Sequence, residues 1–256
     1  MKASNQRPMN FLFSFVLSAI FLTIWEIMVR VNHIPIYLLP APSRAFQVLA
    51  QQPGYFAEAL SITLIEAFIG LALGFLAGFS IASLINTFPQ FEDGVMTLAI
   101  LIKSTPLVAI APLLTIWLGF GVFPKIIITG LLTFFPILIN VLVGFQSGNR
   151  DLMDLMMVFK SSKWQTYSKL KVFLSLPFIF AALRVSAPLA LVGAVVAEWT
   201  GASGGLGRVM WLSYANLNLP PLFASIFILS LSGMAIYSLI VQIEQKIIRW
   251  NQFQVT

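Results

Sequence analysis

The chain has 256 residues, of which 59% are hydrophobic and 9% are charged, and its mean hydropathy is +0.92. These values exclude an ordinary soluble domain. Cysteine is absent and His33 is the single histidine, so the chain offers neither a disulfide framework nor a multi-histidine metal centre. The net charge of +6 is compatible with nucleic-acid binding, but lysine and arginine at the cytoplasmic membrane surface explain it better in so apolar a chain.

Apolar runs long enough to cross a bilayer recur along the chain, and their continuity predicts helices rather than a barrel. The first run follows Lys2 and Arg7, as in a signal peptide. It is longer than a signal core and has no small-residue cleavage site behind it, so we expect a retained anchor. The expected fold is an all-α polytopic membrane protein, with one transmembrane domain over residues 1–256. The predicted spanning helices cover residues 11–30, 58–86, 95–118, 124–146, 176–199 and 221–245.

Two segments between these helices have distinctive compositions. Residues 31–57 contain four prolines, which predicts extended or turn-rich structure at the outer surface. Residues 201–221 are too long for a tight turn and too apolar for a free loop, which predicts a short interfacial or re-entrant helix. The glycine cluster GASGGLG in this segment is typical of a flexible turn at a helix end, and an anion-binding nest is the alternative.

The distribution of basic residues predicts the orientation of the chain. With the N-terminus in the cytoplasm, nine basic residues fall on inner segments and four on outer segments. The chain then lies in the cytoplasmic (inner) membrane with both termini in the cytoplasm, and residues 147–175 lie on the side where ATP is. The inner residues are Lys2, Arg7, Arg150, Lys160, Lys163, Lys169, Lys171, Lys246 and Arg249, and the outer ones are Arg30, Arg44, Lys125 and Arg208.

Residues 147–175 hold much of the charge of this apolar chain. Asp151 and Asp154 stand in the first turn of a short predicted helix, where the helix dipole favours anions. Either Ser161 or Ser162 is expected to cap a second short helix. Apolar residues at helical spacing are Leu152, Leu155, Met156 and Phe159 on the first helix and Trp164, Tyr167 and Leu170 on the second. Such a pair either rests on anionic lipid or docks into a cytoplasmic partner, and the residues alone leave both interpretations open.

The sequence has few residues from which an enzyme active site is built. It contains no Gly-Lys dipeptide and hence no P-loop, and no GxGxxG follows a strand. Nucleophile–base pairs and metal-ligand clusters are also missing. We therefore expect a non-catalytic subunit without a cofactor or metal of its own, and without a nucleic-acid partner.

Small and polar residues inside the predicted spans indicate packing and pathway sites. Gly70, Gly74 and Gly78 recur every fourth residue, which predicts a seam for close helix packing. Polar residues at membrane depth are candidates for a translocation pathway, namely Thr129, Thr133, Asn140, Ser186 and Glu198. A solvated or ion-paired carboxylate is an equal interpretation of Glu198. For Glu66, Arg184 is a candidate partner.

Several segments together resemble one family of transport proteins. Residues 151–177, DLMDLMMVFKSSKWQTYSKLKVFLSLP, resemble the EAA loop of ABC importer permeases, in the type I branch that includes nitrate, sulfonate and taurine permeases. Asp154 stands at the family's glutamate, Lys160 at its glycine, and Phe173 and Pro177 at its two prolines. Residues 162–165, Ser-Lys-Trp-Gln, match the family's usual Ser-Arg-Trp-Gln. The segments IPIYLLPAPS, STPLVAIAPLLTIWLGFG and GAVVAEWTGASGGLG look like the same branch, so the resemblance covers most of the chain.

The resemblance implies a function, partners and site residues. In such permeases the loop is a coupling helix that fits a cleft on an ATPase subunit, which implies this role for Asp154, Lys160, Ser161, Ser162, Lys163, Trp164, Gln165 and Tyr167. The implied partners are two ATPase subunits that bind ATP and magnesium, a second permease copy or paralogue, an external solute-binding protein and the lipid bilayer. The family's glycine permits a left-handed turn, so Lys160 is expected to cost about 1 kcal/mol there.

The solute and the function class have alternatives. The Glu198-Trp199 pair is similar to the subgroup that handles thiamine-precursor pyrimidines and riboflavin-like heterocycles, and the sulfonate, taurine and nitrate permeases are the competing subgroup. An ion-coupled secondary transporter predicts intramembrane carboxylates and inverted repeats. A membrane scaffold predicts binding without transport. No internal repeat is evident and deep acidic residues are few, so an ATP-driven importer permease is the predicted function.

Overall fold

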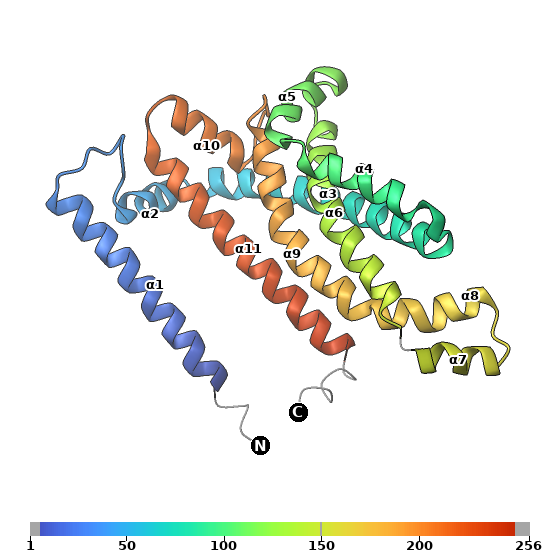
Figure 1. Ribbon diagram of the computed structural model, residues 1–256. Coiled ribbons are helices and arrows are strands. Elements are labelled where there is room, and N and C mark those ends of the chain that lie inside the picture. The colour runs from blue at the N-terminus through green and yellow to red at the C-terminus, as the bar shows by residue number, and fades with distance from the viewer. Residues whose placement is uncertain (1–5, 149, 249–256) are drawn as a thin grey trace.

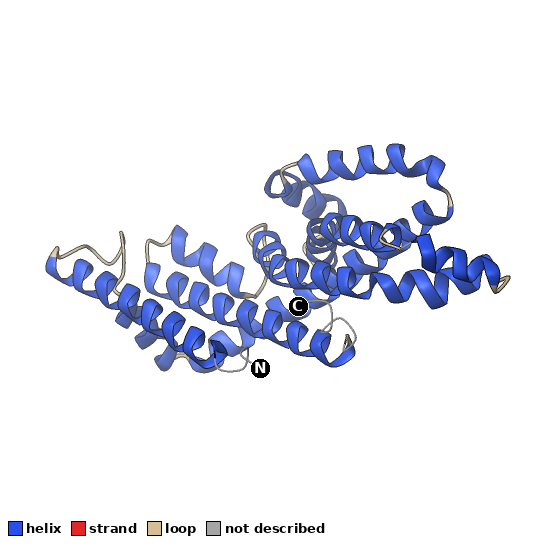
Figure 2. Cartoon of the chain, turned by 60° about the horizontal axis from the view of Figure 1, so that its bottom comes forward, coloured by secondary structure: helices blue, strands red, loops and turns tan. Residues whose placement is uncertain are grey.

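The computed structural model describes residues 6–148 and 150–248, and these residues form helices with no strand among them (Figures 1 and 2). This confirms the predicted all-α fold. In chain order the helices are α1 (Gln6–Val31), α2 (Pro42–Gln51), α3 (Pro53–Thr87), the 3₁₀ turn η1 (Pro89–Phe91), α4 (Glu92–Ser104), α5 (Leu107–Leu118), α6 (Phe123–Gln146), α7 (Arg150–Val158), α8 (Lys163–Thr166), the π-helical turn η2 (Tyr167–Lys171), α9 (Val172–Glu198), α10 (Leu206–Ala215) and α11 (Leu219–Ile247).

Four helices are long and apolar enough to cross a membrane, namely α3, α6, the continuous helix Lys163–Glu198 and α11. Helices α4 and α5 together are also long and apolar enough to cross, but the axis of η1–α4 makes an angle of 92° with that of α5. If this pair counts as one broken span, there are five crossings. Helix α1 covers the first predicted span and lies outside this count. By this criterion the described residues contain four spans, or five with the broken pair, where the sequence predicts six.

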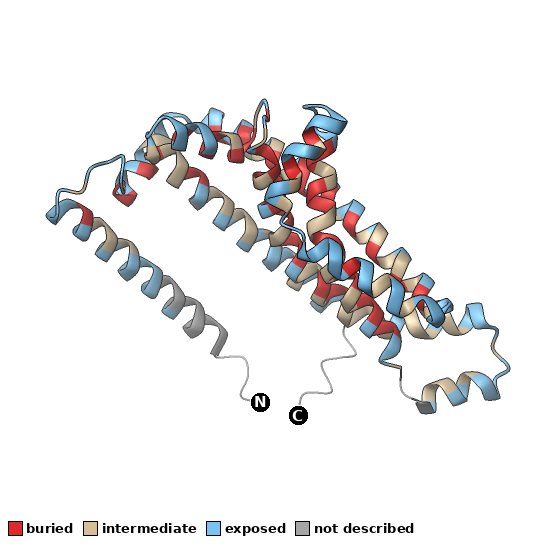
Figure 3. Cartoon of the chain, turned by 45° about the horizontal axis from the view of Figure 1, so that its top comes forward, coloured by how far each residue is buried: buried red, intermediate tan, exposed pale blue. Residues whose placement is uncertain are grey.

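The core of the bundle lies where α3, α6 and α9 meet. Buried side chains gather on these central helices, whereas the described residues of α1 are mostly exposed (Figure 3). Helix α1 contacts α11 through the ring of Trp25, which packs against Phe223 and Phe227 at centroid distances of 5.3 and 6.1 Å. It contacts α2 through Glu26, which accepts hydrogen bonds from Ser43. The central helices thus carry most of the packing.

The glycines at four-residue spacing on α3 lie against α6. A methyl group added at Gly70 or Gly74 would collide with Thr129 or Thr133, respectively. At Gly74 it would also lie 2.7 Å from the carbonyl oxygen of Gly130, a backbone atom that cannot rotate away. The approach at Gly78 is less tight, and the backbone nitrogen of Leu138 would lie 3.0 Å from the added carbon. The backbones of α3 and α6 therefore approach closely along the stripe for which the sequence predicts close packing.

Three local features differ from the sequence-based expectations. The predicted helix 95–118 is broken at Thr105, whose extended backbone (ψ 129°) is the conformation that a residue before proline prefers. Residues 42–51 of the expected extended segment form α2, with Pro42 at its first position. The predicted span 176–199 has no start of its own near Pro177, because it continues the helix that begins at Lys163. The short helix expected within residues 201–221 is confirmed as α10.

Candidate functional site

The helices α7 and α8 project from one end of the bundle (Figure 1), and the turn between them is left-handed. Lys160 has a φ of +49°. Its N–H donates to Met157 O at 2.9 Å, and the Ser161 N–H donates to Met156 O at 3.0 Å. These two bonds form a Schellman motif, which usually has glycine at the left-handed position. Lysine therefore adopts the turn for which the family uses glycine.

The start of α8 is set by a capping box. The Ser162 hydroxyl accepts the backbone N–H of Gln165 at 3.2 Å, and the Gln165 side chain accepts the Ser162 N–H at 2.8 Å. Each residue satisfies a backbone donor that the first turn of a helix leaves free. Of the two serines that the sequence offers, Ser162 is the cap, while the Ser161 hydroxyl lies 3.9 Å from the Met156 sulfur.

Large apolar side chains are exposed around this turn. Met157, Val158, Phe159 and Trp164 are 67%, 77%, 71% and 71% exposed, and we call these four residues the tip. The charged residues Asp154, Lys160 and Lys163 are also exposed beside them. The tip differs in part from the expected stripe, because Leu152 and Met156 are half-buried. A group of exposed apolar residues with a charged rim is typical of a surface that another molecule covers.

Tyr167 belongs to the base of the helix pair rather than to its tip. Its ring is half-buried against Phe145 of α6, at a centroid distance of 5.5 Å. Its hydroxyl forms a 2.7 Å hydrogen bond with the Ser83 hydroxyl of α3. One turn further along, Lys171 donates to the Asn86 side chain of α3 at 2.6 Å. Residues of η2 thus connect the projecting helices to two central helices. π-helical turns of this kind often occur at functional sites.

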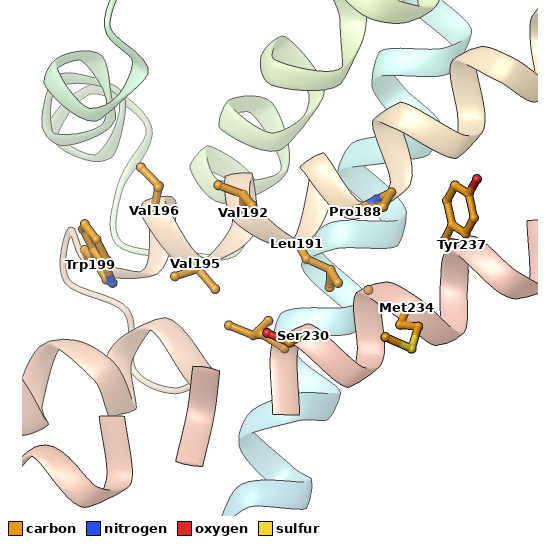
Figure 4. Close-up of a pocket in the computed structure, with 11 residues that line it drawn as sticks. Pro188, Leu191, Val192, Val195, Val196, Trp199, Ser230, Met234 and Tyr237 are labelled. Carbon is orange, nitrogen blue, oxygen red and sulfur yellow. The ribbon is translucent and has the colours of Figure 1, made fainter. Parts of the chain in front are cut away.

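The residues predicted for a translocation pathway lie between helices of this chain. Thr129, Thr133 and Ser186 are fully buried, and Glu198 is 1% exposed. Thr133 donates to the carbonyl oxygen of Thr129 at 3.0 Å, and the half-buried Asn140 donates to that of Pro136 at 2.7 Å. Glu198 is therefore not a solvated carboxylate. None of the five residues lines the apolar groove of about 530 Å³ between α9 and α11, whose walls include Trp199, Ser230 and Tyr237 (Figure 4).

The partner of Glu66 is Lys125 of α6, not Arg184. The Lys125 ammonium lies 2.6 Å from Glu66 Oε1, and both side chains are buried. Arg184 lies 3.4 Å from a carboxylate oxygen of Glu244 on α11 instead. Lysine at the start of a predicted span is the signal that would have found this pair, because a cation near a membrane helix end needs either water or a buried anion.

Comparison with known proteins identifies the family. Residues 70–249 match the model of the family described as "Binding-protein-dependent transport system inner membrane component". The chain belongs to this family. The importer permease is 35% identical to the formylaminopyrimidine transport permease ThiX of Halalkalibacterium halodurans, over 91% of this chain and 93% of that protein.

More distant relatives carry other solute names. The riboflavin permease RibX of Chloroflexus aurantiacus is 28% identical over 90% of the importer permease and 87% of its own length. The putative aliphatic sulfonate permease SsuC of Bacillus subtilis is 26% identical over 98% and 91%. The fold is shared with a solved structure of the MetNI methionine ABC transporter, at 16% identity and a TM-score of 0.68 over 77% of the importer permease and 97% of that chain.

Proposed function

We propose that α7 and α8 of this importer permease dock into a separate ATPase subunit and transmit its movement to the membrane helices. The observation that carries the proposal is the division of the helix pair into two parts. The tip exposes most of its apolar side-chain surface, with Trp164 packed against Tyr167 at a ring-centroid distance of 5.7 Å, whereas the base is bonded to α3 and α6. A segment with one part free for a partner and the other attached to the core is suited to pass on a displacement.

The electrostatics of the tip support a protein partner of mixed polarity. Trp164 offers the largest exposed side chain, and tryptophan is enriched among the residues that dominate binding energy. Asp154, Lys160 and Lys163 of the same projecting segment are also exposed and carry both signs of charge. Charged residues at the rim of an interface chiefly fix its orientation and its rate of association. Trp164 is thus the proposed anchor, and the charged side chains are proposed to affect the orientation and rate of docking rather than its affinity.

Helix α3 is the proposed route by which the movement travels outward. It contains 35 residues without a break. Near its C-terminal end, Ser83 and Asn86 form hydrogen bonds with Tyr167 and Lys171 at the base of the helix pair. The glycine seam locks α3 to α6, so a displacement of one helix is shared by the other. In alternating access, such shared movement opens a pathway on one side of the membrane and closes it on the other. Thr129, Thr133 and Asn140 of α6 and Ser186 of α9 are proposed to act in this movement as packing residues of the pathway helices.

The proposed solute is a nitrogen heterocycle of the pyrimidine class, delivered by an external binding protein. The support is the relation to ThiX, which at 35% identity exceeds the 26% identity to the sulfonate permease SsuC. The riboflavin permease RibX, at 28%, also names a heterocyclic solute. The further proposed partners are two ATPase subunits, which bind ATP and magnesium, and a second permease copy or paralogue. Both termini are proposed to lie in the cytoplasm.

The docking proposal is tested by mild-detergent purification of the chain from its native membrane, with bound proteins identified by mass spectrometry. We expect a P-loop ATPase in stoichiometric amount with the wild type and its loss with Trp164→Ala. Trp117→Ala is the matched control, because Trp117 of α5 is 70% exposed but lies outside the helix pair. Retention of the ATPase by Trp164→Ala would instead support helices that rest on lipid, and absence of an ATPase from the wild type would support a scaffold or a secondary transporter.

The solute is tested separately in proteoliposomes that contain the purified complex and its binding protein. Labelled aminopyrimidine, riboflavin and an aliphatic sulfonate are offered with and without ATP. We expect ATP-dependent uptake of the aminopyrimidine. Uptake of the sulfonate alone would overturn the solute proposal and leave the docking proposal intact.

A further inference from the structure

Three charged side chains are buried together at the junction of α3, α6 and α9. Glu66 and Glu198 are each 1% exposed, and Lys125 is 6% exposed. Lys125 binds Glu66 Oε1 at 2.6 Å, and Glu198 is bound at 2.7 Å by the hydroxyl of Thr63, which lies one turn before Glu66 on α3. We call these three residues the carboxyl cluster. Buried charges of this kind are costly unless each is paired and hydrogen-bonded, so the cluster requires a full account of its donors and acceptors.

Both oxygens of Glu198 already accept hydrogen bonds. The Thr63 hydroxyl donates to Oε1 at 2.7 Å, and the backbone N–H of Gly207 donates to Oε2. The Leu206 N–H donates to the Thr63 hydroxyl oxygen at 2.8 Å. Glu198 and Thr63 therefore bind the free N–H groups at the start of α10, where the helix dipole favours a negative partner.

The glycine segment before α10 is shaped around the same carboxyl group. Gly205 has a φ of +102°, and a methyl group added there would collide with the Glu198 carboxyl group. At Gly207, an added methyl carbon would lie 2.8 Å from Glu198 Oε2. The anion that this glycine cluster receives is thus a side chain of the chain itself.

Glu66 has one acceptor left over. Its Oε1 receives the Lys125 ammonium, but its Oε2 is buried and has no hydrogen-bond partner among the described residues. The neighbouring carboxyl group of Glu198 presents only acceptors when it is ionised. An ionised Glu198 therefore offers no hydrogen to Glu66 Oε2, and a buried acceptor without a donor costs about 1–3 kcal/mol.

The charges of the cluster also do not balance. Two carboxylates and one ammonium leave one negative charge in excess. The other charged groups of the packed helices lie elsewhere: Glu58 and Arg208 line a cavity of about 130 Å³ beside Gly205, and Arg184 of α9 pairs with Glu244 of α11. Helix α5, packed on α6 and α9, has no ionisable residue, and Lys125 is the single one on α6.

We propose that the carboxyl cluster is a proton-binding site, in which one proton is held between Glu66 and Glu198. The proton converts the contact between two acceptors into an O–H···O hydrogen bond and supplies the missing donor for Glu66 Oε2. It also makes the cluster neutral. Two carboxyl groups forced into one site share a proton for the same reason in other proteins. The neutral cluster docks the N-terminus of α10 on α3, so this docking depends on a bound proton. The inference does not rest on the proposed transport function.

Infrared spectroscopy of the purified, folded chain tests the proposal through the carbonyl stretch of a protonated carboxyl group, recognised by its shift in heavy water. We expect this band at neutral pH, where an exposed glutamate is ionised. Glu66→Gln and Glu198→Gln should each remove it, because one carboxylate then balances Lys125. Glu58→Gln is the matched control on α3, since Glu58 is exposed, and it should leave the band unchanged. Absence of the band from the wild type, or its survival in both cluster variants, would overturn the proposal.

Two further variants keep the test decisive if Glu198→Gln does not fold. In Glu66→Gln the amide oxygen can accept from Lys125 and the amide N–H can donate to Glu198, so the variant should fold like the wild type while lacking the band. Lys125→Met removes the cation, so both carboxyl groups should be protonated and the band should grow roughly twofold. An unchanged band in Lys125→Met would overturn the charge balance with Lys125 on which the proposal rests.

Discussion

The projecting helices at one end of the bundle and the carboxyl cluster near the other use the same residue types in opposite ways. In α7 and α8 the charges of Asp154, Lys160 and Lys163 are exposed, and the bonds that set the turn join residues three to five positions apart. In the carboxyl cluster the bonds join residues 59 and 135 positions apart, and the charges are buried. A solvated charge can be moved or removed at little cost, whereas a buried one holds its neighbours in place.

The largest difference between the two regions is expected when one carboxylate is removed from each. Glu198→Ala should destabilise the folded chain by about 3 kcal/mol, because it leaves the Thr63 and Gly207 donors unpaired and opens a cavity. Asp154→Ala, in the exposed α7, should change stability by less than about 0.5 kcal/mol. Thermal unfolding of both variants in detergent measures the contrast. Similar melting temperatures would show that the buried contacts of Glu198 contribute little.

The seam between the two regions should respond less strongly than the carboxyl cluster. Gly74→Ala forces a methyl group onto Thr133 and the Gly130 carbonyl oxygen, and such overpacking costs about 1–3 kcal/mol. Gly94→Ala is its control, because nothing lies within 4 Å of the added carbon. The control should be neutral or stabilising by up to about 1 kcal/mol, since alanine favours helix. A destabilisation of equal size in both variants would argue against close packing of α3 on α6.

The base and the tip of the helix pair should separate coupling from docking. Tyr167→Phe removes the hydroxyl that bonds Ser83, a loss of about 1 kcal/mol, and leaves the tip intact. We expect it to bind the ATPase normally but to transport less solute per ATP, and Ser83→Ala should have the same effect. The double variant should be no worse than either single one. If Tyr167→Phe transports as much solute per ATP as the wild type, the hydrogen bond between Tyr167 and Ser83 does not transmit the movement.

The smallest effect is expected at the left-handed turn. Lys160→Gly relieves a φ of +49° and should stabilise the turn by about 1 kcal/mol at most, with ATPase binding unchanged. Lys163→Gly, three residues later in α8, should instead destabilise that helix by up to about 1 kcal/mol. Purification with the ATPase compares the two variants. A severe loss of binding in Lys160→Gly alone would assign the lysine a direct contact with the partner.

The amino-acid sequence by itself determined the apolar runs, the glycine stripe on α3, and the charged helix pair with its caps. These features depend on hydropathy and on hydrogen bonds between residues a few positions apart, so they can be read without knowing how the chain folds. The sequence left both Ser161 and Ser162 open as the cap of α8, and the structure shows that Ser162 is the cap, with Gln165 as its partner.

Only the tertiary structure decided which helices became neighbours, and with them the partner of Glu66 and the burial of Glu198. Lys125 and Arg184 were both available to Glu66, and the close approach of α3 to α6 selected Lys125. The same packing enclosed Glu198 under the first turn of α10. An ionic contact of this kind depends on distance in space and on burial, and neither quantity is contained in the spacing of residues along the chain.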